Sequence, residues 1–395
     1  MGYGMEITGI GGGHAALALA VTAGVAYTGL GLRQVLGWRG NRPPGPAPSW
    51  RWREAAPELP PLSVLKPLCG AEPRLYECLR SFCQQDYPDL QIVFGVRHAD
   101  DPAVAVVERL RHEFPEREIA LVCDNRLHGS NLKISNLVNM QAACRHDLIM
   151  LSDSDIEVAP GALRAITAEM TANPAVGAVS CLYVGQPTAG WVSRLGALNV
   201  NGWILPSVLL DKAINGIDCA MGAVLLLRRA ALDSVGGLKA VADHFADDHE
   251  IGERLTEAGW LVRLSAHPVT TMVNETRLSD LLRHEIRWAQ TVWVTRPFAH
   301  LLSVVCFLLP VQLALLALAP SWPGALAVLG YILLRLGLVA SVNRRFALPR
   351  PDSLWLVPLR ECLCFVGWLG CMTRRTIVWR GHAFRLRRDG RLVPA

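Results

Sequence analysis

The sequence predicts an α/β fold with a mainly parallel sheet, helices on both faces of that sheet, and transmembrane helices at both ends of the chain. Between residues 62 and 264, strand-like apolar runs alternate with amphipathic stretches, which is typical of parallel strands joined by helices. Long uncharged apolar segments lie on either side of that region. The 395-residue chain is 51% hydrophobic and 18% charged, which is too apolar for an ordinary soluble protein.

The expected strands and helices follow from period and length. The strands are expected at 62–66, 92–96, 119–123, 148–151, 176–183, 222–227 and 260–264. The helices are expected at about 75–84, 104–113, 134–144, 160–171 and 278–294. The apolar stretch 195–210 fits this alternation poorly. It is typical either of a helix in a protein core or of a surface segment that enters a membrane.

Three apolar segments are candidates for membrane contact. Residues 7–32 carry no acidic or basic side chain and are long enough to cross about 30 Å of hydrocarbon. Residues 297–334 are also uncharged, and Pro320-Ser321-Trp322-Pro323-Gly324 divides them into two halves, as in a hairpin. Residues 354–372 contain Arg360-Glu361 near their middle. That segment therefore either packs inside a bundle or lies at the interface, and we favour an interfacial or re-entrant segment.

Charge distribution predicts the orientation. Arginines follow both the first span and the hairpin, so both flanks are expected on the cytoplasmic side. The expected parts are an N-terminal transmembrane anchor (1–40), a linker (41–61), a cytoplasmic α/β domain (62–276), an amphipathic interfacial helix (277–296), a transmembrane hairpin (297–342), and a third apolar segment with a basic tail (343–395). The net charge of +5 suits contact with anionic lipid, and no nucleic-acid site is indicated.

An acidic pair ends one of the predicted strands. Leu148-Ile149-Met150-Leu151 runs into Ser152-Asp153-Ser154-Asp155, which delivers two carboxylates to the carboxyl edge of the sheet. Carboxylates so placed suit Mg²⁺ or Mn²⁺, which take oxygen ligands and share them with substrate phosphates. The alternative is an acidic turn followed by a helix cap.

Two further acidic elements accompany this pair. Asp101 follows the strand at 92–96 and precedes a proline, which is also a common turn pattern. Asp247 and Asp248 precede a helix expected to begin near Ile251. Helix capping accounts for one of these two aspartates, and the other could act as a general base toward an incoming hydroxyl.

The helix expected at 278–294 carries a cationic and aromatic face. His284, Arg287, Trp288 and Thr291 follow the i, i+3, i+4, i+7 spacing and therefore share one side. Such a face could neutralise a diphosphate leaving group. An interfacial helix with arginine and tryptophan at headgroup level has the same pattern.

Together these elements resemble the inverting, metal-dependent nucleotide-sugar transferases of GT-A fold, and most closely the membrane-bound ceramide glucosyltransferase group, glycosyltransferase family 21. That family has three separated aspartates followed by (Gln/Arg)-x-x-Arg-Trp, and this chain has Asp101, Asp153, Asp248 and Arg287-Trp288 in that order. The resemblance runs from Ser63 to the end of the chain. It also takes in Val64-Leu65-Lys66-Pro67-Leu68, Asn131-Leu132-Lys133-Ile134-Ser135-Asn136-Leu137, Arg360-Glu361 and Trp379-Arg380-Gly381.

The resemblance implies roles for these residues. Asp101 would help to hold the uridine of a UDP-sugar, and Lys133 and Asn136 would belong to the substrate-binding residues. Asp153, with Asp155 as an auxiliary ligand, would bind Mn²⁺ or Mg²⁺. Asp248, beside Asp247, would be the catalytic base, and His284, Arg287 and Trp288 would steady the leaving diphosphate. The implied reaction is inverting transfer of one hexose from a UDP-sugar to a hydroxyl of a membrane lipid, as in glucosylceramide synthesis.

Two departures from the family pattern bear on the acceptor and the leaving group. His284 stands where the eukaryotic pattern has Gln or Arg, so its contribution depends on protonation. Leu205 stands where the animal enzymes carry a histidine near the acceptor. Local features resemble instead the bacterial hopanoid-associated members, which implies N-acetylglucosamine transfer to a hopanoid polyol as an alternative and location in a bacterial inner membrane.

Two more remote functions share part of this pattern. A processive polysaccharide synthase would have the same aspartates and the Arg-Trp helix, but it would normally need more membrane spans to enclose a polymer channel. A non-enzymatic membrane transporter or lipid-binding protein would account for the apolar segments but not for the acidic and cationic elements gathered at one edge of the sheet.

Overall fold

The computed structural model describes residues 3–39, 59–216, 220–348, 350–373, 376–379 and 382–395, with backbone alone for 3–11, 378, 379 and 382. Apart from residues 59–61, the linker predicted at 41–61 lies outside the described residues. The chain divides into two compact units. The sheet unit comprises residues 39–184, 215–274 and 383–395, and the helical unit comprises residues 1–38, 185–214 and 275–382.

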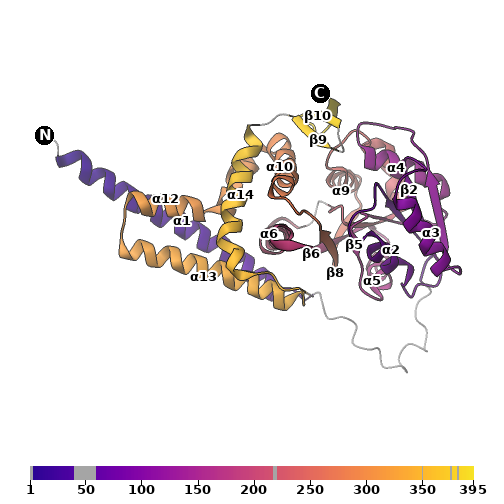
Figure 1. The fold of residues 1–395 in the computed structure, drawn as a ribbon, viewed down its shortest axis with the longest axis horizontal. Coiled ribbons are helices and arrows are strands. Elements are labelled where there is room, and N and C mark those ends of the chain that lie inside the picture. The colour runs from indigo at the N-terminus through magenta and orange to yellow at the C-terminus, as the bar shows by residue number, and fades with distance from the viewer. Residues whose placement is uncertain (1–2, 40–58, 217–219, 349, 374–375, 380–381) are drawn as a thin grey trace, which may run out of the picture. The chain divides into compact units, whose positions relative to one another are not determined.

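The sheet unit is built on an eight-stranded sheet of order β3-β2-β1-β4-β7-β6-β8-β5 (Figure 1). Its strands are β1 (Leu62–Pro67), β2 (Leu90–Val96), β3 (Glu118–Cys123), β4 (Leu148–Ser152), β5 (Ile156–Glu157), β6 (Val176–Pro187), β7 (Val224–Arg228) and β8 (Leu261–Val273). The first four strands are parallel, whereas β7 pairs antiparallel with β4 and β6. The carboxyl ends of β1, β2, β3 and β4 therefore meet at one edge.

Helices cover both faces of this sheet because its central strands are apolar on both sides. The helices are α2 (Leu75–Cys83), α3 (Ala103–Glu113), α4 (Leu132–Met140), α5 (Ala162–Thr171), α8 (Arg229–Ser234) and α9 (Asp247–Glu257). Leu62 and Val64 of β1 join the core formed with α2, α3 and α5. Leu65 points the other way and joins the core formed with α4, α8 and α9. The predicted α/β class, with helices on both faces of a mixed but mostly parallel sheet, is confirmed.

Each predicted strand is present, with shifts of a few residues at its ends. β6 and β8 extend well beyond their predicted ends, and β5 was not predicted. The helix expected to begin near Ile251 begins instead at Asp247, so both aspartates lie in its first turn. This earlier start has a physical reason, since acidic side chains interact favourably with the N-terminal end of a helix.

The helical unit contains the apolar helices from both ends of the chain. Its elements are α1 (Tyr3–Gly37), α6 (Gly190–Asn199), α7 (Leu205–Asn215), α10 (Leu278–Thr295), α11 (Pro297–Leu302), α12 (Leu309–Leu318), α13 (Trp322–Arg345), α14 (Val357–Met372) and β9 (Thr376–Trp379). A π-helical turn at Val200–Ile204 joins α6 to α7. The segment 185–214 thus groups with the apolar helices, although it falls inside the predicted α/β domain. Conversely, the chain end, with β10 (His382–Leu386) and β11 (Leu392–Pro394), groups mostly with the sheet unit.

Among the described residues, three segments are long and apolar enough to cross a membrane: 12–37, 322–345 and 354–372. A fourth candidate, 297–318, is bent by 65° at the break before α12. The length and composition of these helices indicate an integral membrane protein.

Two charged residues near the start of α14 are buried and paired. Arg360 donates two hydrogen bonds to Glu285 of α10, at 2.9 and 2.6 Å, and Glu361 lies 3.3 Å from Arg335 of α13 and accepts from Tyr331. Both charges therefore face protein and not lipid.

Candidate active site

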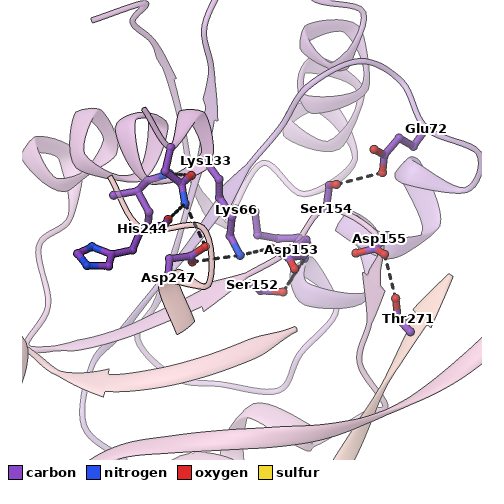
Figure 2. A network of polar contacts seen from close by, with 12 residues as sticks. Lys66, Glu72, Lys133, Ser152, Asp153, Ser154, Asp155, His244, Asp247 and Thr271 are labelled. Carbon is purple, nitrogen blue, oxygen red and sulfur yellow. Dashed lines mark hydrogen bonds and ion pairs between the residues drawn. The ribbon is translucent and has the colours of Figure 1, made fainter. Parts of the chain in front are cut away.

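Asp153 lies at the centre of a network of charged side chains at the carboxyl edge of the sheet (Figure 2). It follows β4 directly, and its Oδ1 lies 2.7 Å from Nζ of Lys133. Lys133 also lies 3.6 Å from Oδ2 of Asp247. Burial alone would lower the pKa of Lys133, but Asp153 and Asp247 outweigh that effect and raise it, so the side chain stays a cation.

Asn131 explains why Lys133 and Asp247 meet. Its side chain caps α4 by accepting a hydrogen bond from the backbone of Ile134, which fixes the first turn that carries Lys133. The same side chain donates to the carbonyl of His244 at 2.8 Å and to Asp247 at 3.2 Å. One amide therefore joins the start of α4 to the start of α9.

Asp155 lies on the other side of Asp153, where its Oδ2 accepts a hydrogen bond from Thr271 of β8 at 2.9 Å (Figure 2). Burial, reinforced by the charge of Asp153, raises the pKa of Asp155 to about 6. The two carboxylates therefore repel each other across a short stretch of chain. A cation placed between them would relieve that repulsion.

Asp248 also has a raised pKa, at about 6, because it is buried and because Asp247 repels it, while Lys133 acts in the opposite direction. Gly222, just before β7, approaches Asp248 closely: a Cβ there would lie 3.1 Å from Oδ2 of Asp248 and 3.5 Å from Nζ of Lys133. A side chain at position 222 would therefore crowd both groups.

Lys66 is a member of this network that was not assigned a role from the sequence. It is fully buried in β1, and its Nζ donates to Oγ of Ser152 at 2.9 Å and to the carbonyl of Asp153 at 2.7 Å. Burial lowers its pKa to about 8. Its position inside an otherwise apolar strand could have indicated a role in the site, because a buried charge needs a partner close by.

Tyr183 of β6 and Thr271 were also missed. Burial raises the pKa of Tyr183, and the charges of Asp248 and Asp153 raise it further, so the phenol lies within the field of the same carboxylates. No sequence pattern links Tyr183 to the aspartates, because β6 joins the sheet through antiparallel pairing far along the chain.

Asp101 and Asn136 lie in the sheet unit but make other contacts. Both carboxylate oxygens of Asp101 accept from the backbone of Gly70, at 3.0 and 3.1 Å, and Oδ1 also accepts from Ala103. Asp101 thus ties the loop after β1 to the start of α3. Asn136 is buried and donates to the carbonyl of Gly95 in β2.

His284, Arg287 and Trp288 lie on α10 in the helical unit. His284 packs edge-on against Trp288, with ring centroids 4.3 Å apart, and its Nδ1 lies 2.6 Å from Oε1 of Glu275. Burial alone would raise the pKa of Glu275, but His284 outweighs this and lowers it. The predicted shared face is therefore present as a packed histidine and tryptophan pair.

The network in the sheet unit fits a divalent cation. Four carboxylates (Asp153, Asp155, Asp247 and Asp248) and two ammonium groups (Lys66 and Lys133) leave a net charge of −2 when all are ionised. Among the described residues, no cluster of three or more His, Cys, Asp and Glu side chains is arranged to hold a metal alone. Two carboxylates that share the ion with a substrate diphosphate match the usual Mg²⁺ arrangement.

A family model described as "Glycosyl transferase family 21" matches residues 17–392 of the chain. The chain belongs to glycosyltransferase family 21. It is therefore a glycosyltransferase, and a non-enzymatic transporter or lipid-binding protein is excluded.

Curated members of this family are distant in sequence but similar over most of their length. Ceramide glucosyltransferase 1 of Caenorhabditis elegans is 24% identical over 353 residues, which cover 86% of this chain and 74% of the relative. Ceramide glucosyltransferase of Pyricularia oryzae is 24% identical over 460 residues, which cover 92% of this chain and 91% of the relative.

Two solved structures are also similar. A mannosyltransferase from Pyrobaculum calidifontis, in complex with GDP-Man and Mn²⁺, matches with a TM-score of 0.49 and 20% identity, over 90% of this chain and 99% of that chain. TarS of S. aureus, in complex with UDP-GlcNAc, matches with a TM-score of 0.39 and 12% identity, over 85% of this chain and 99% of that chain.

Proposed function

We propose that this glycosyltransferase moves one hexose from a UDP-sugar to a hydroxyl group of a membrane lipid, with inversion at the anomeric carbon and with Mn²⁺ or Mg²⁺. The supporting observation is the charged network around Asp153, whose net charge of −2 a divalent cation would offset. The apolar helices of the same chain support a lipid acceptor.

Asp153 and Asp155 would hold the metal, which would supply charge neutralisation for the diphosphate. Lys133 would hold Asp153 in place and would add a positive charge beside the nucleotide. Asp101 would shape the loop that receives the uridine, because its carboxylate organises the backbone of Gly70. Asn136 would help to position that region through its hydrogen bond to the carbonyl of Gly95 in β2.

Asp248 would be the general base. In the proposed step, its carboxylate takes the proton of the acceptor hydroxyl, the acceptor oxygen forms a bond to C1 of the sugar, and the bond from C1 to the diphosphate oxygen breaks with its electron pair on UDP. Asp247, paired with Lys133, would raise the basicity of Asp248 by repulsion. Arg287, Trp288 and His284 would stabilise the departing diphosphate.

The family relatives favour ceramide as the acceptor and glucose as the sugar. Leu205, which is buried in α7 where the animal enzymes carry a histidine, favours the second candidate, N-acetylglucosamine transfer to a hopanoid polyol. In either case the sheet unit would face the cytoplasm, where nucleotide sugars are present, and for the hopanoid case the membrane would be a bacterial inner membrane.

The test incubates detergent-purified full-length protein with UDP-glucose, UDP-galactose or UDP-N-acetylglucosamine, each with ceramide and with a hopanoid polyol, in Mn²⁺, Mg²⁺ or EDTA. Products are identified by mass. We expect one sugar to be added to one lipid class, and only with metal. Release of UDP with growth of a polymer and no glycolipid would overturn the proposal in favour of a polysaccharide synthase.

A further inference from the structure

A cavity of about 360 Å³ lies in the helical unit, and none of the residues assigned above lines it. It is lined by the end of β6, the start of α6 and the loop between α13 and α14. Its lining side chains include two guanidinium groups, Arg194 and Arg350, and one carboxyl group, Asp352. Nothing in the proposed transfer reaction uses these three residues.

Asp352 is the unusual member of this set. It is only 8% exposed, and its Oδ2 has no hydrogen-bond partner among the described residues. Burial raises its pKa to about 7, although a hydrogen bond with Asn201 acts in the opposite direction. Its backbone is fixed, because its N–H donates to Asn343 and its carbonyl accepts from the same side chain. Burying a carboxyl oxygen that accepts no hydrogen bond costs free energy of folding. That cost is removed when a hydrogen-bond donor or a cation binds to the oxygen.

The two arginines are anchored but retain free donor capacity. Arg194 donates through Nη1 to Ser353 at 3.3 Å, and Arg350 donates through Nη1 to the carbonyl of Pro187 at 3.2 Å. Each guanidinium has five N–H donors, so most of them stay available to an anion. Within the described residues, neither arginine forms an ion pair with Asp352.

Two neighbouring features favour a position of the cavity at the depth of lipid headgroups. The loop that carries Arg350 and Asp352 follows the 24-residue helix α13, which is a candidate membrane span. Trp355, three residues after Asp352, is 72% exposed, as is common for tryptophans at a membrane surface. Basic pockets beside transmembrane helices on such a surface bind phospholipid headgroups.

We propose that this cavity binds the headgroup of a zwitterionic phospholipid of the phosphoethanolamine type, with the phosphate between Arg194 and Arg350 and the ammonium group at Asp352. Two guanidinium groups alone would suit any anionic lipid. The buried carboxylate selects a ligand that also carries an N–H cation, because only such a group can both neutralise the carboxylate and donate to it. The proposal does not depend on the sugar or the acceptor of the transfer reaction.

The test uses native mass spectrometry of the full-length protein in detergent, with equal amounts of phosphatidylethanolamine, phosphatidylcholine and phosphatidylglycerol of the same acyl chains. The wild type should retain phosphatidylethanolamine preferentially. The double variant Arg194→Gln/Arg350→Gln should lose at least about tenfold in affinity for it, the amount expected for lost charge-assisted hydrogen bonds. Asp352→Asn should abolish the preference over phosphatidylglycerol while leaving phosphatidylglycerol binding in place.

Arg344→Gln is the matched control, because Arg344 is exposed at the end of α13 but does not line the cavity. It should bind as the wild type does, and all variants should keep the wild-type unfolding temperature. Equal retention of the three lipids by the wild type, or unchanged binding in the double variant, would overturn the proposal. Binding of free phosphoethanolamine without binding of the lipid would contradict the assignment to the bilayer.

Discussion

At the scale of single residues, the main result is that the carboxylates of the site are not equivalent. Asp153 is paired with a lysine, whereas Asp155 and Asp248 have pKa values of about 6 because burial and neighbouring charges oppose ionisation. The sequence pattern placed these aspartates in order along the chain. The family resemblance implied separate roles for them, but it gave no sign of their different pKa values, because these depend on burial and on contacts with Lys133 and Thr271 of other elements.

Replacing Asp153 with Asn should weaken metal-dependent binding of UDP-sugar by about tenfold or more, through loss of one charged ligand. Equilibrium binding of a UDP-sugar in Mn²⁺ and in EDTA measures this. Asp147→Asn is the control, because that carboxylate is 93% exposed just before β4 and should not matter. Unchanged binding in Asp153→Asn, with metal still required, would remove Asp153 from the metal site.

The activity should fall as the pH drops through about 6. The folded-state pKa of Asp248 is raised above its usual value, so protonation removes the base already at weakly acidic pH. The same shift means that this carboxyl group favours the folded state most at low pH, and that its contribution to stability declines as the pH rises from about 4 to about 6. The check is a pH profile of kcat/KM at saturating metal. A rate that rises on acidification below pH 6 would contradict the assignment.

At the scale of elements, the sequence predicted the sheet well because its strands are short, apolar and separated by regular helices. The prediction from sequence failed for elements whose structure depends on tertiary contacts. β5 has two residues and exists only through pairing with β8. For the apolar stretch 195–210, the sequence left a core helix and a membrane-facing surface both open, and the structure groups it with the apolar helices. Arg360 and Glu361 likewise gave an ambiguous pattern, since only the three-dimensional packing supplies Glu285 and Arg335 as partners.

The pair between Glu285 and Arg360 should hold α10 against α14. Glu285→Gln would leave the buried guanidinium of Arg360 uncompensated and should cost about 3–5 kcal/mol of stability, with a marked loss in unfolding temperature in detergent. The double variant Glu285→Leu/Arg360→Leu should recover much of this loss. Asp280→Asn, which removes an exposed pair with Arg283 on the same helix, should cost at most about 1 kcal/mol. Similar losses for Glu285→Gln and Asp280→Asn would show that the buried pair has no special role.

At the scale of the whole molecule, hydrogen bonds constrain the path of the chain through the membrane. Gly390 and Leu392 of the tail are hydrogen-bonded to Phe245 and Asp243 of the sheet unit, so the tail lies on the same side as that unit. Arg350 is hydrogen-bonded to Pro187, the last residue of a strand that begins in the sheet. Because an open strand cannot cross a bilayer, we expect the loop before α14 on that side too.

We therefore expect both ends of α14, a helix of 16 residues, on one side, so that the helix lies along the membrane surface. In Figure 1, α14 runs across α1, α12 and α13, which lie alongside one another. Length and composition alone also allow α14 to cross the membrane.

Epitope tags inserted at Pro174, at Ser321 and after Ala395 can check this topology in sealed vesicles of defined orientation. We expect the tags at Pro174 and Ala395 to be accessible on the same side, and the tag at Ser321, between α12 and α13, on the opposite side. Accessibility of the Ser321 tag together with the Pro174 tag would mean that the bent segment is re-entrant and that α14 crosses the membrane.

The most direct test of the central claim is a single-turnover assay of Asp248→Asn in full-length protein, with UDP-sugar and lipid acceptor at saturation and UDP-sugar binding measured in parallel. The proposed role of Asp248 as general base predicts unchanged binding and a loss of about 10²–10⁴-fold in the rate of glycolipid formation. Wild-type glycolipid formation by Asp248→Asn would contradict it.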